Sequence, residues 1–487
     1  MPQPKINKTL TTFLIFSFLT YFWLNSLITV PDWDALSYIM NGKTIAGEQK
    51  YYEWHRPLLL PLILGINFII FGFTELIPRI LGPLLSTFTL FAIYKLGSEI
   101  YNKKTGIYAS LIFFFIPLTI YWAPRMYSAI PCIGLIAMSM YFVDKYAKNS
   151  NPNDMIFFGI FASLAFLMRY VGAASLIMGL IYLLYKNKLN KDFLKAIVSF
   201  LLVSTPFFYL NWVNTGNPIY SMSIANNQMA EFTPTRLDYY LKNMLIIYTP
   251  PLLILLTITL LNGLRLIKNS RREITIKKDD GLIMSLLLFG FFVLYFQAWL
   301  NLKSLRYIIP TFLGFALLCG KGFEITMNWL NNKTNLQKYT PHTLFIICSI
   351  SLIILAPKFF TSCNQYIEIG EYLNTLNGNV VSPAWPYYNY YSERTVKWFP
   401  GTYEQLLEET QTFGIKYAVL TDWASEPEWA TNSFFETSQE FTKINTFTGC
   451  IGTVSVYEYS GTVNGALNTR EPDVINSNAF VPLKIIP

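Results

Sequence analysis

The sequence predicts an α-helical polytopic membrane protein with about 11 transmembrane helices, outer interfacial helices and a small C-terminal extracytoplasmic α/β domain. Three observations lead to this fold class. The chain is 53% hydrophobic and only 14% charged, whereas about a quarter of the residues are charged in ordinary globular domains. Apolar runs long enough to cross a bilayer recur over residues 1–358. Residues 359–487 instead carry short strand-like segments.

The transmembrane domain is expected over residues 1–358. Its first apolar run is too long for the core of a signal peptide, and no small-residue cleavage site follows it, so a retained helix is expected there. Spans are expected at residues 10–29, 80–100, 106–122, 128–143, 155–168, 171–185, 196–212, 243–263, 281–299, 307–323 and 343–358.

A further apolar run, residues 58–73, is shorter, contains Pro61 and follows Pro57. If this run crossed the membrane, every later lysine-rich loop would lie outside, against the positive-inside rule. We therefore expect a helix on the outer membrane interface at this place. With Lys5 and Lys8 before the first span, this arrangement predicts a cytoplasmic N-terminus and, after an odd number of spans, an extracytoplasmic C-terminal domain.

The C-terminal domain, residues 359–487, is predicted to have strands at 379–384, 416–422 and 454–459 and a helix at 403–413. From residue 360 onward there are 6 Lys and Arg against 14 Asp and Glu, and the rest of the chain has 31 against 15. No basic surface of the nucleic-acid kind appears, so membrane topology explains the positive excess better. The five cysteines lack metal-ligand spacing, but Cys363 and Cys450 would pair if the domain faces an oxidising compartment.

The charges expected on the two membrane faces differ in kind. Arginines expected on the outer face are Arg56, Arg79, Arg125, Arg169, Arg236 and Arg306, whereas the inner basic residues are mostly lysines. Only arginine presents a planar fork that binds phosphate through two parallel hydrogen bonds. The outer arginines therefore suggest a lipid phosphate or pyrophosphate ligand. The alternative is that each one extends to lipid headgroups or pairs with a nearby carboxylate.

Acidic residues follow the first span. Asp32 and Asp34 lie where the chain first emerges, and Glu48 lies further along the same loop. A carboxylate in such a loop can act as a general base or hold a divalent cation. An aspartate before residues 35–46 would also be a good helix N-cap. We expect one of the two aspartates to cap this helix and the other to be available for chemistry.

Several motifs follow in a defined order. Residues 34–38, DALSY, keep the Asp and the Tyr of an acidic first-loop motif but lack its Glu. The later motifs are HRPLLLPLILGINFIIFG (55–72), PRILGPLLSTFTLFAIYKLGSEIYNKKTGIYASLIFFFIP (78–117), LAFLMRY (164–170), PFFYLNWVNTGNPIY (206–220) and LRYIIPTFLGFALLCGKG (305–322). In this order they resemble the C-type superfamily of membrane glycosyltransferases, which use polyprenyl-phosphate sugars and include protein O-mannosyltransferases and lipid A aminoarabinose transferases. The resemblance extends to about residue 325.

The resemblance implies roles for particular residues. Asp34 matches the first-loop catalytic base, with Asp32 or Glu48 as a supporting acid or as a ligand of a divalent cation. Arg306 and Tyr307 match an Arg-Tyr pair near the lipid phosphate of the donor, and Arg56, Arg79 and Arg125 are candidates to assist them. Relatives usually have an acid in the second outer loop where this chain has Ala129.

The expected reaction is inverting transfer of a hexosyl or pentosyl group from a polyprenyl-phosphate sugar to the hydroxyl of a glycan, lipid or protein acceptor. It requires Asp34 and Arg306 to meet in one outward-facing pocket. The alternatives are a lipid or polysaccharide transporter or flippase, or a lipid-linked oligosaccharide polymerase. A transporter tends to carry ionisable residues on broken helices at mid-membrane, and Thr249-Pro250-Pro251 is a candidate helix break. The aromatic-rich residues 384–403 either contact the acceptor or stabilise the C-terminal domain.

Overall fold

The computed structural model describes residues 8–47, 52–231, 238–270, 280–298, 305–331, 363–392, 394–421 and 427–461. The chain divides into two compact units. Unit 1 consists of Met1–Asn25, His55–Leu60 and Leu76–Phe359. Unit 2 consists of Ser26–Trp54, Pro61–Glu75 and Phe360–Pro487. The first loop, with its acidic residues, is therefore grouped with the C-terminal region, and each unit is described below by itself.

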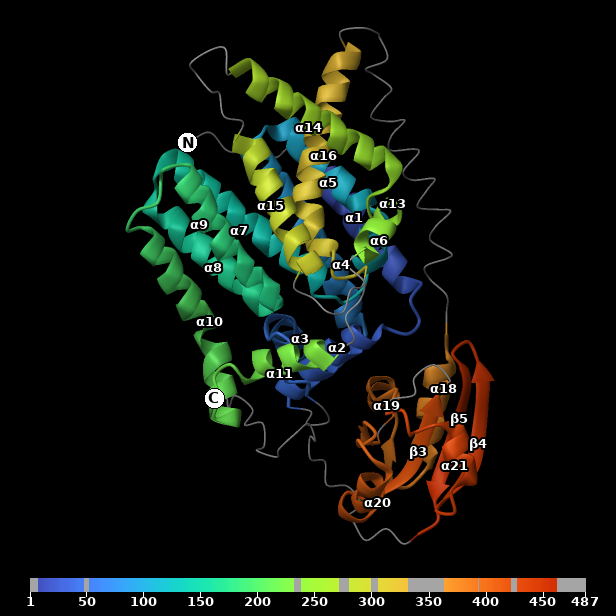
Figure 1. Ribbon diagram of the computed structural model, residues 1–487. Helices are drawn as coiled ribbons and strands as arrows, with labels where there is room; N and C mark the ends of the chain where they lie inside the picture. The colour runs from blue at the N-terminus through green and yellow to red at the C-terminus, as the bar shows by residue number, and fades with distance from the viewer. Residues whose placement is uncertain are drawn as a thin grey trace. The chain divides into compact units, whose positions relative to one another are not determined.

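Unit 1 is helical (Figure 1). Its elements are α1 (Lys8–Ser26), α4 (Leu76–Ile100), α5 (Lys103–Phe115), α6 (Pro117–Trp122), α7 (Ala129–Asn149), α8 (Pro152–Met168), η1 (Tyr170–Ala173), α9 (Ala174–Tyr185), α10 (Phe193–Thr215), α11 (Tyr220–Glu231), α12 (Tyr239–Lys242), α13 (Met244–Tyr248), α14 (Pro250–Ser270), α15 (Asp280–Ala298), η2 (Ile309–Thr311) and α16 (Phe312–Asn331). Helices occupy every expected span up to residue 331, while the expected span at 343–358 lies outside the described residues.

Local sequence explains where these helices begin and end. Asn102 caps α5, because its side chain accepts hydrogen bonds from the backbone amides of Lys104 and Thr105, both at 3.0 Å. The predicted break at residues 249–251 is confirmed, since α13 ends before Thr249 and α14 begins at Pro250. Thr249 has a φ of 53°, in the left-handed region that a β-branched residue rarely adopts.

Small and hydroxylated residues bring the helices of unit 1 together. A Cβ on Gly97 of α4 would stand 2.9 Å from the Cα of Gly106 on α5, so neither position has room for a larger residue. Hydroxyls join neighbouring helices where Ser110 donates to the carbonyl of Leu90 at 2.8 Å and Thr89 donates to that of Ile130 at 2.9 Å. This combination of close backbone approach and hydroxyl bonding is typical of helix packing within membranes.

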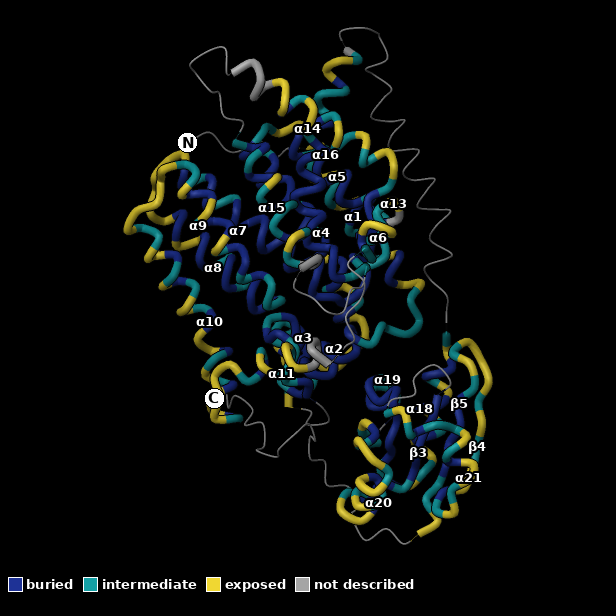
Figure 2. The backbone as a smooth tube through the Cα atoms, viewed as in Figure 1, coloured by how far each residue is buried: buried dark blue, intermediate teal, exposed yellow. Residues whose placement is uncertain are grey.

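The outer surface of unit 1 suits lipid. Within the described residues, α4 and α10 are long and apolar enough to cross a membrane by length and composition. Figure 2 shows α7 largely buried, whereas α10 is mostly exposed or intermediate. The exposed residues of α10 include Leu194, Val198, Leu201, Leu202, Trp212 and Val213. A continuous exposed apolar face of this length supports a membrane location.

Unit 2 contains a five-stranded mixed sheet in the order β2-β1-β3-β5-β4. Its strands are β1 (Asn379–Val381), β2 (Val396–Lys397), β3 (Ile415–Thr421), β4 (Phe441–Gly449) and β5 (Gly452–Tyr459), and its helices are α2 (Trp33–Ile45), α3 (Leu59–Phe71, which enters this unit at Pro61), α18 (Gln365–Thr375), α19 (Trp385–Tyr391), α20 (Tyr403–Thr412) and α21 (Asn432–Thr437). Strand β1 pairs in parallel with β2 and β3, whereas β5 is antiparallel to both β3 and β4.

Helices cover both faces of the sheet. Residues of α18 and α19 pack with Val380, Val419 and Val456 on one face, and residues of α20 and α21 pack with Val381, Ala418 and Leu420 on the other. The alternation of neighbouring residues between faces follows the two-residue period of a strand. Met40 of α2 belongs to the first of these cores, and Val30 and Trp33 pack against it. The first loop is therefore built into the hydrophobic core of the α/β region.

The three predicted strands and the predicted helix at 403–413 correspond to β1, β3, β5 and α20. Strands β2 and β4 were not predicted. Strand β2 has only two residues, and β4 is an edge strand in which only Phe441 is buried, so neither carries a clear apolar alternation.

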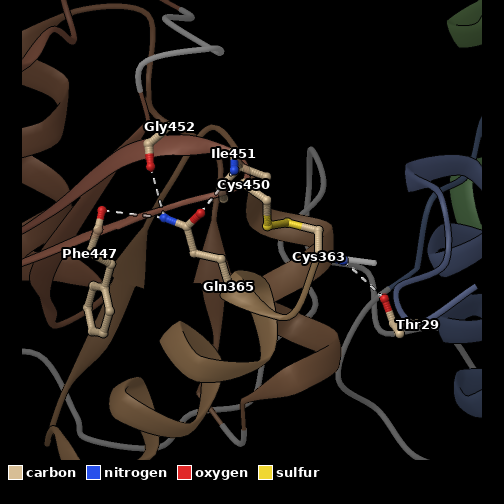
Figure 3. The surroundings of a disulfide bond; sticks show 7 residues. All are labelled: Thr29, Cys363, Gln365, Phe447, Cys450, Ile451 and Gly452. Atoms are coloured by element: carbon tan, nitrogen blue, oxygen red, sulfur yellow. Dashed lines mark hydrogen bonds between the residues drawn. A yellow bond between two sulfur atoms is a disulfide. The ribbon is translucent and has the colours of Figure 1, made fainter. Parts of the chain in front are cut away.

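The disulfide foreseen as a possibility is present. Cys363 and Cys450 are bonded, with 5.7 Å between their Cα atoms. Figure 3 shows Gln365 beside this bond, where its side chain donates to the carbonyl of Gly452 at 3.0 Å and accepts from the amide of Ile451 at 2.9 Å. The amide of Cys363 donates to the hydroxyl of Thr29 at 3.2 Å. The disulfide region thus holds the start of α18 against the β4–β5 turn and the first loop.

Candidate functional site

The two aspartates of the first loop lie at the start of α2. Asp32 occupies the N-cap position, with φ −65° and ψ 158°, but its side chain makes no capping hydrogen bond. Asp34 lies in the first turn and is 8% exposed. As expected, one aspartate, Asp32, occupies the N-cap position, but its side chain does not form the capping hydrogen bond. A negative charge in this first turn is favoured by the helix dipole.

A third acid, Glu53, belongs to the same region. Its side chain is 2% exposed and accepts a hydrogen bond from the hydroxyl of Ser37 at 2.9 Å. Its backbone amide donates to Asn41 Oδ1 at 2.7 Å, and Asn41 Nδ2 donates to its carbonyl at 3.0 Å. Asp34, Ser37 and Asn41 are spaced by three and four residues, so they lie on one face of α2. From the sequence we placed Glu53 in the first loop but gave it no role, because its burial depends on contacts made by the folded loop.

Aromatic rings surround the start of α2. The Trp33 ring centre lies 5.7 Å from that of Trp385, 6.0 Å from that of Tyr387 and 6.4 Å from that of Trp398. Burial, together with the nearby Tyr366 and Asp32, raises the pKa of the Tyr387 hydroxyl, and Asp34 adds to the effect. Both aspartates therefore act electrostatically on this aromatic group.

The predicted donor-binding pair, Arg306 and Tyr307, lies in unit 1 immediately before η2. The guanidinium of Arg306 lies 5.2 Å from the Tyr307 ring centre, and its Nη2 donates to the Tyr307 hydroxyl at 3.3 Å. Arg169, at the end of α8, lies 5.6 Å from the same ring and 5.6 Å from the ring of Tyr127. Two arginines from distant parts of the chain thus share one buried tyrosine.

Arg125 joins this group through aromatic neighbours. Its guanidinium lies 3.7 Å from the Tyr121 ring centre and donates to the Tyr121 carbonyl. It also lies 6.0 Å from the ring of Trp122, which stacks on Tyr127 at 4.6 Å. Because Tyr127 contacts Arg169, a continuous series of side chains leads from Arg125 to Arg306. We call Arg125, Arg169, Arg306 and their four aromatic neighbours, Tyr121, Trp122, Tyr127 and Tyr307, the arginine cluster.

The remaining predicted residues are placed less centrally. Arg79 donates to the carbonyl of Asn25 at 3.4 Å, and the Asn25 side chain donates to the carbonyl of Pro124, next to Arg125.

Arg56 is half-buried in the turn that precedes α3. Glu48 and Arg236 lie outside the described residues. Ala129, at the position where the resemblance implies an acid, is a fully buried residue at the start of α7.

The arginine cluster is chemically suited to an anion. Aromatic rings that pack against a guanidinium restrict its side chain before a ligand binds. The side chain then loses less conformational entropy on binding. Several such groups around a phosphate would stabilise the charge of a phosphate leaving group. Across the described part of the chain, no group of three or more His, Cys, Asp or Glu side chains is arranged to hold a metal ion.

Comparison with known proteins shows which families and folds the chain resembles. Residues 55–212 match the family model described as dolichyl-phosphate-mannose-protein mannosyltransferase. The crystal structure of ArnT from Cupriavidus metallidurans bound to undecaprenyl phosphate matches with a TM-score of 0.64 at 11% identity, covering 93% of this chain and 99% of that one. The chain has the C-type glycosyltransferase fold. The resemblance predicted from the motif order is thereby confirmed.

Two further structures share the C-type fold. AglB, the oligosaccharyltransferase from Archaeoglobus fulgidus, solved with an inhibitory peptide and a dolichol-phosphate, matches with a TM-score of 0.59 at 11% identity, over 93% of this chain and 74% of that one. The arabinofuranosyltransferase AftD from Mycobacteria matches with a TM-score of 0.52 at 11% identity, over 94% of this chain and 42% of that one. No curated protein matches the chain by sequence.

Proposed function

We propose that this protein transfers a sugar from a polyprenyl-phosphate donor to an acceptor hydroxyl at the outer membrane face, with inversion at the anomeric carbon. The observation that carries this proposal is the arrangement of Arg169 and Arg306 on the single ring of Tyr307, in a chain whose residues 55–212 match a family that uses a lipid-phosphate sugar. The carriers found with ArnT and AglB, undecaprenyl phosphate and dolichol-phosphate, are ligands of the same chemical class.

The proposed reaction assigns a role to each group. The acceptor oxygen attacks the anomeric carbon, its proton passes to the Asp34 carboxylate, and the bond from that carbon to the phosphate oxygen breaks. The electron pair of this bond remains on the polyprenyl phosphate. Arg306 and Arg169 would stabilise the growing negative charge, assisted by Arg125. Arg56 and Arg79 are further donor-side candidates, whereas Asp32 and Glu48 would assist Asp34 or hold a divalent cation.

The proposed topology follows from charge and from the disulfide. Lys5 and Lys8 favour a cytoplasmic N-terminus. The Cys363–Cys450 bond favours an extracytoplasmic, oxidising location for the C-terminal domain. The α3 helix, with exposed Ile66, Ile69 and Ile70, is proposed to lie on the outer interface. A lipid-phosphate sugar presents its reactive carbon at that same level.

The test uses membranes that contain the wild type or Asp34→Asn, supplied with radiolabelled polyprenyl-phosphate mannose, glucose or aminoarabinose. We expect the wild type to consume one of these donors and release polyprenyl phosphate, and Asp34→Asn to do so about 100- to 10,000-fold more slowly. Equal consumption by both proteins would remove Asp34 from the mechanism. Movement of an intact donor across the membrane without release of polyprenyl phosphate would instead indicate a transporter. Parallel assays with and without EDTA test the role of a divalent cation.

A further inference from the structure

Three indole rings contact one another in unit 2. Trp33 begins α2, Trp385 begins α19, and Trp398 directly follows β2. The ring centres lie 5.7 Å apart for Trp33 and Trp385, 6.4 Å for Trp33 and Trp398, and 6.3 Å for Trp385 and Trp398. We call these three residues the tryptophan triad. It joins the acidic start of α2 to two separate segments of the α/β region.

Packing explains only part of the triad. Trp385 is 9% exposed and belongs to the hydrophobic core, and Trp33 packs against that core. Trp398, in contrast, is 44% exposed. Among the described residues from 363 to 461, it is the one large apolar side chain in the exposed class. A core function therefore accounts for Trp33 and Trp385, whereas Trp398 keeps part of its surface accessible to a ligand.

The surroundings of the triad combine aromatic rings with acids. Trp33 is flanked in sequence by Asp32 and Asp34. Both carboxylates influence the hydroxyl of Tyr387, whose ring centre is 6.0 Å from that of Trp33. This region thus combines flat apolar surfaces with carboxylates.

Lipid is a poorer match to this surface. An extended apolar surface is present elsewhere in the same unit, on α3, where Ile66, Ile69, Ile70 and Phe71 are exposed. Around Trp398 the chain is mixed instead, with Lys397 partly exposed and Gly401 and Thr402 exposed. One exposed ring beside polar residues matches a ligand that presents a small apolar face together with hydroxyl groups. A saccharide ring has this combination, because its axial C–H bonds form an apolar face and its hydroxyls project from the rim.

We propose that Trp398 and Trp33 form an acceptor subsite and that the acceptor is a saccharide, whose ring stacks on the exposed indole. This inference rests on the proposed function and specifies its acceptor as a glycan rather than a protein side chain or a lipid alcohol. Asp34 acts on the hydroxyl of Tyr387, whose ring centre lies 6.0 Å from that of Trp33, so a sugar held at the triad would lie in the same region as the proposed base. Trp398 is then a specificity-determining residue that binds the acceptor without taking part in proton transfer.

Saccharide binding is tested first without turnover. Purified Asp34→Asn protein is titrated with maltose, cellobiose, mannobiose and chitobiose, and saturation-transfer NMR reports which sugar protons approach the protein. We expect ring C–H protons of at least one disaccharide to receive saturation. Trp398→Ala, added to the same background, should bind that sugar about tenfold more weakly, and Trp398→Tyr should retain most of the affinity. Trp212→Ala is the matched control, because it removes an indole that is 59% exposed on α10 in unit 1.

Kinetics separate this inference from the proposed function. In otherwise wild-type protein, Trp398→Ala should raise KM for a saccharide acceptor about tenfold and leave KM for the lipid donor and donor hydrolysis without acceptor unchanged. Two results would refute the acceptor subsite even when donor turnover is observed. One is that no disaccharide binds. The other is that the Trp398→Ala protein binds a disaccharide as tightly as the protein that keeps Trp398. The fluorescence of Trp398 can be obtained as the difference between the wild type and Trp398→Ala. Quenching of this fluorescence in vesicles of brominated phosphatidylcholine would show that lipid covers the ring, and it would also refute the acceptor subsite. An absence of donor turnover with intact saccharide binding would instead refute the proposed function alone.

Discussion

The guanidinium of Arg169 lies 5.6 Å from the ring centre of Tyr307, and the guanidinium of Arg306 lies 5.2 Å from the same ring. The two arginines come from the end of α8 and from the turn before η2. Each is followed by a tyrosine, Tyr170 in one case and Tyr307 in the other. An anion bound beside this ring would be attracted by both guanidinium groups. This shared attraction underlies the first prediction.

Arg169→Ala and Arg306→Ala should each weaken binding of a polyprenyl phosphate by about tenfold to a hundredfold, the range expected for loss of hydrogen bonds to a charged group. Titration of purified protein with a fluorescent polyprenyl phosphate measures the Kd. Arg265→Ala is a matched control, because Arg265 is an exposed arginine on α14 that is expected on the inner face. Affinities that fall equally in all three variants would show that only net charge matters.

Tyr307→Ala should weaken donor binding more than Tyr307→Phe does. The ring contacts both arginines, whereas the hydroxyl accepts one hydrogen bond among the described residues, from Arg306 at 3.3 Å. Loss of the ring would free both guanidinium groups to adopt other rotamers, at an entropic cost when they bind phosphate. The same fluorescent titration distinguishes the two variants. A larger loss in Tyr307→Phe than in Tyr307→Ala would assign the donor contact to the hydroxyl instead of the ring.

The motif order correctly predicted the resemblance to membrane glycosyltransferases. The donor-binding roles of Arg306, Tyr307 and Arg125 stay predictions. Arg169 was recognised as an outer arginine within LAFLMRY but was not assigned to the donor site. The signal that would have found it is the repeated Arg-Tyr pair at 169–170 and 306–307. Its contact with Tyr307 joins residues on distant helices, so periodicity along the chain carries no information about it.

The contacts of Glu53 and of the tryptophan triad could not be predicted from the sequence for a related reason. Glu53 is held by hydrogen bonds to Ser37 and Asn41 of α2, which form only in the folded loop. Trp33, Trp385 and Trp398 meet only because α2 packs into the core of the α/β region. The short strand β2 and the exposed edge strand β4 also lacked a period from which to predict them. The meeting of Asp34 with Arg306 stays a prediction.

Asn41→Ala should destabilise the first loop. The Asn41 side chain is fully buried and joins the backbone amide and carbonyl of Glu53 to α2, at 2.7 and 3.0 Å. Removing it leaves both buried backbone groups without these bonds, which costs about 1–3 kcal/mol for each group. Thermal unfolding in detergent should show a lower Tm, and Asn364→Ala, at an exposed position in the same unit, serves as the control. An unchanged Tm would mean that water replaces the hydrogen bonds of the Asn41 side chain without lowering the free energy of unfolding.

Cys363→Ser combined with Cys450→Ser should loosen the C-terminal region. The disulfide closes a segment with a sequence separation of 87 residues, and a loop of that length corresponds to about 4.6 kcal/mol of stabilisation in the chain-entropy model. Limited proteolysis should cleave residues 363–461 faster in the double variant than in the wild type. Dithiothreitol should accelerate cleavage of the wild type only, since the double variant has no bond to reduce. Equal cleavage of the oxidised wild type and the variant would assign the stability to the sheet core alone.

The central claim is a division of labour, in which Asp34 performs proton transfer and the arginine cluster binds the lipid phosphate. The most direct measurement determines, for the wild type, Asp34→Asn and Arg306→Ala, both the Kd for polyprenyl phosphate and the single-turnover rate of sugar transfer at saturating donor. The account predicts that Asp34→Asn keeps the wild-type Kd and loses transfer by about 100-fold or more, while Arg306→Ala shows the weaker Kd. Transfer by Asp34→Asn at the wild-type rate, with its donor affinity intact, would contradict the account.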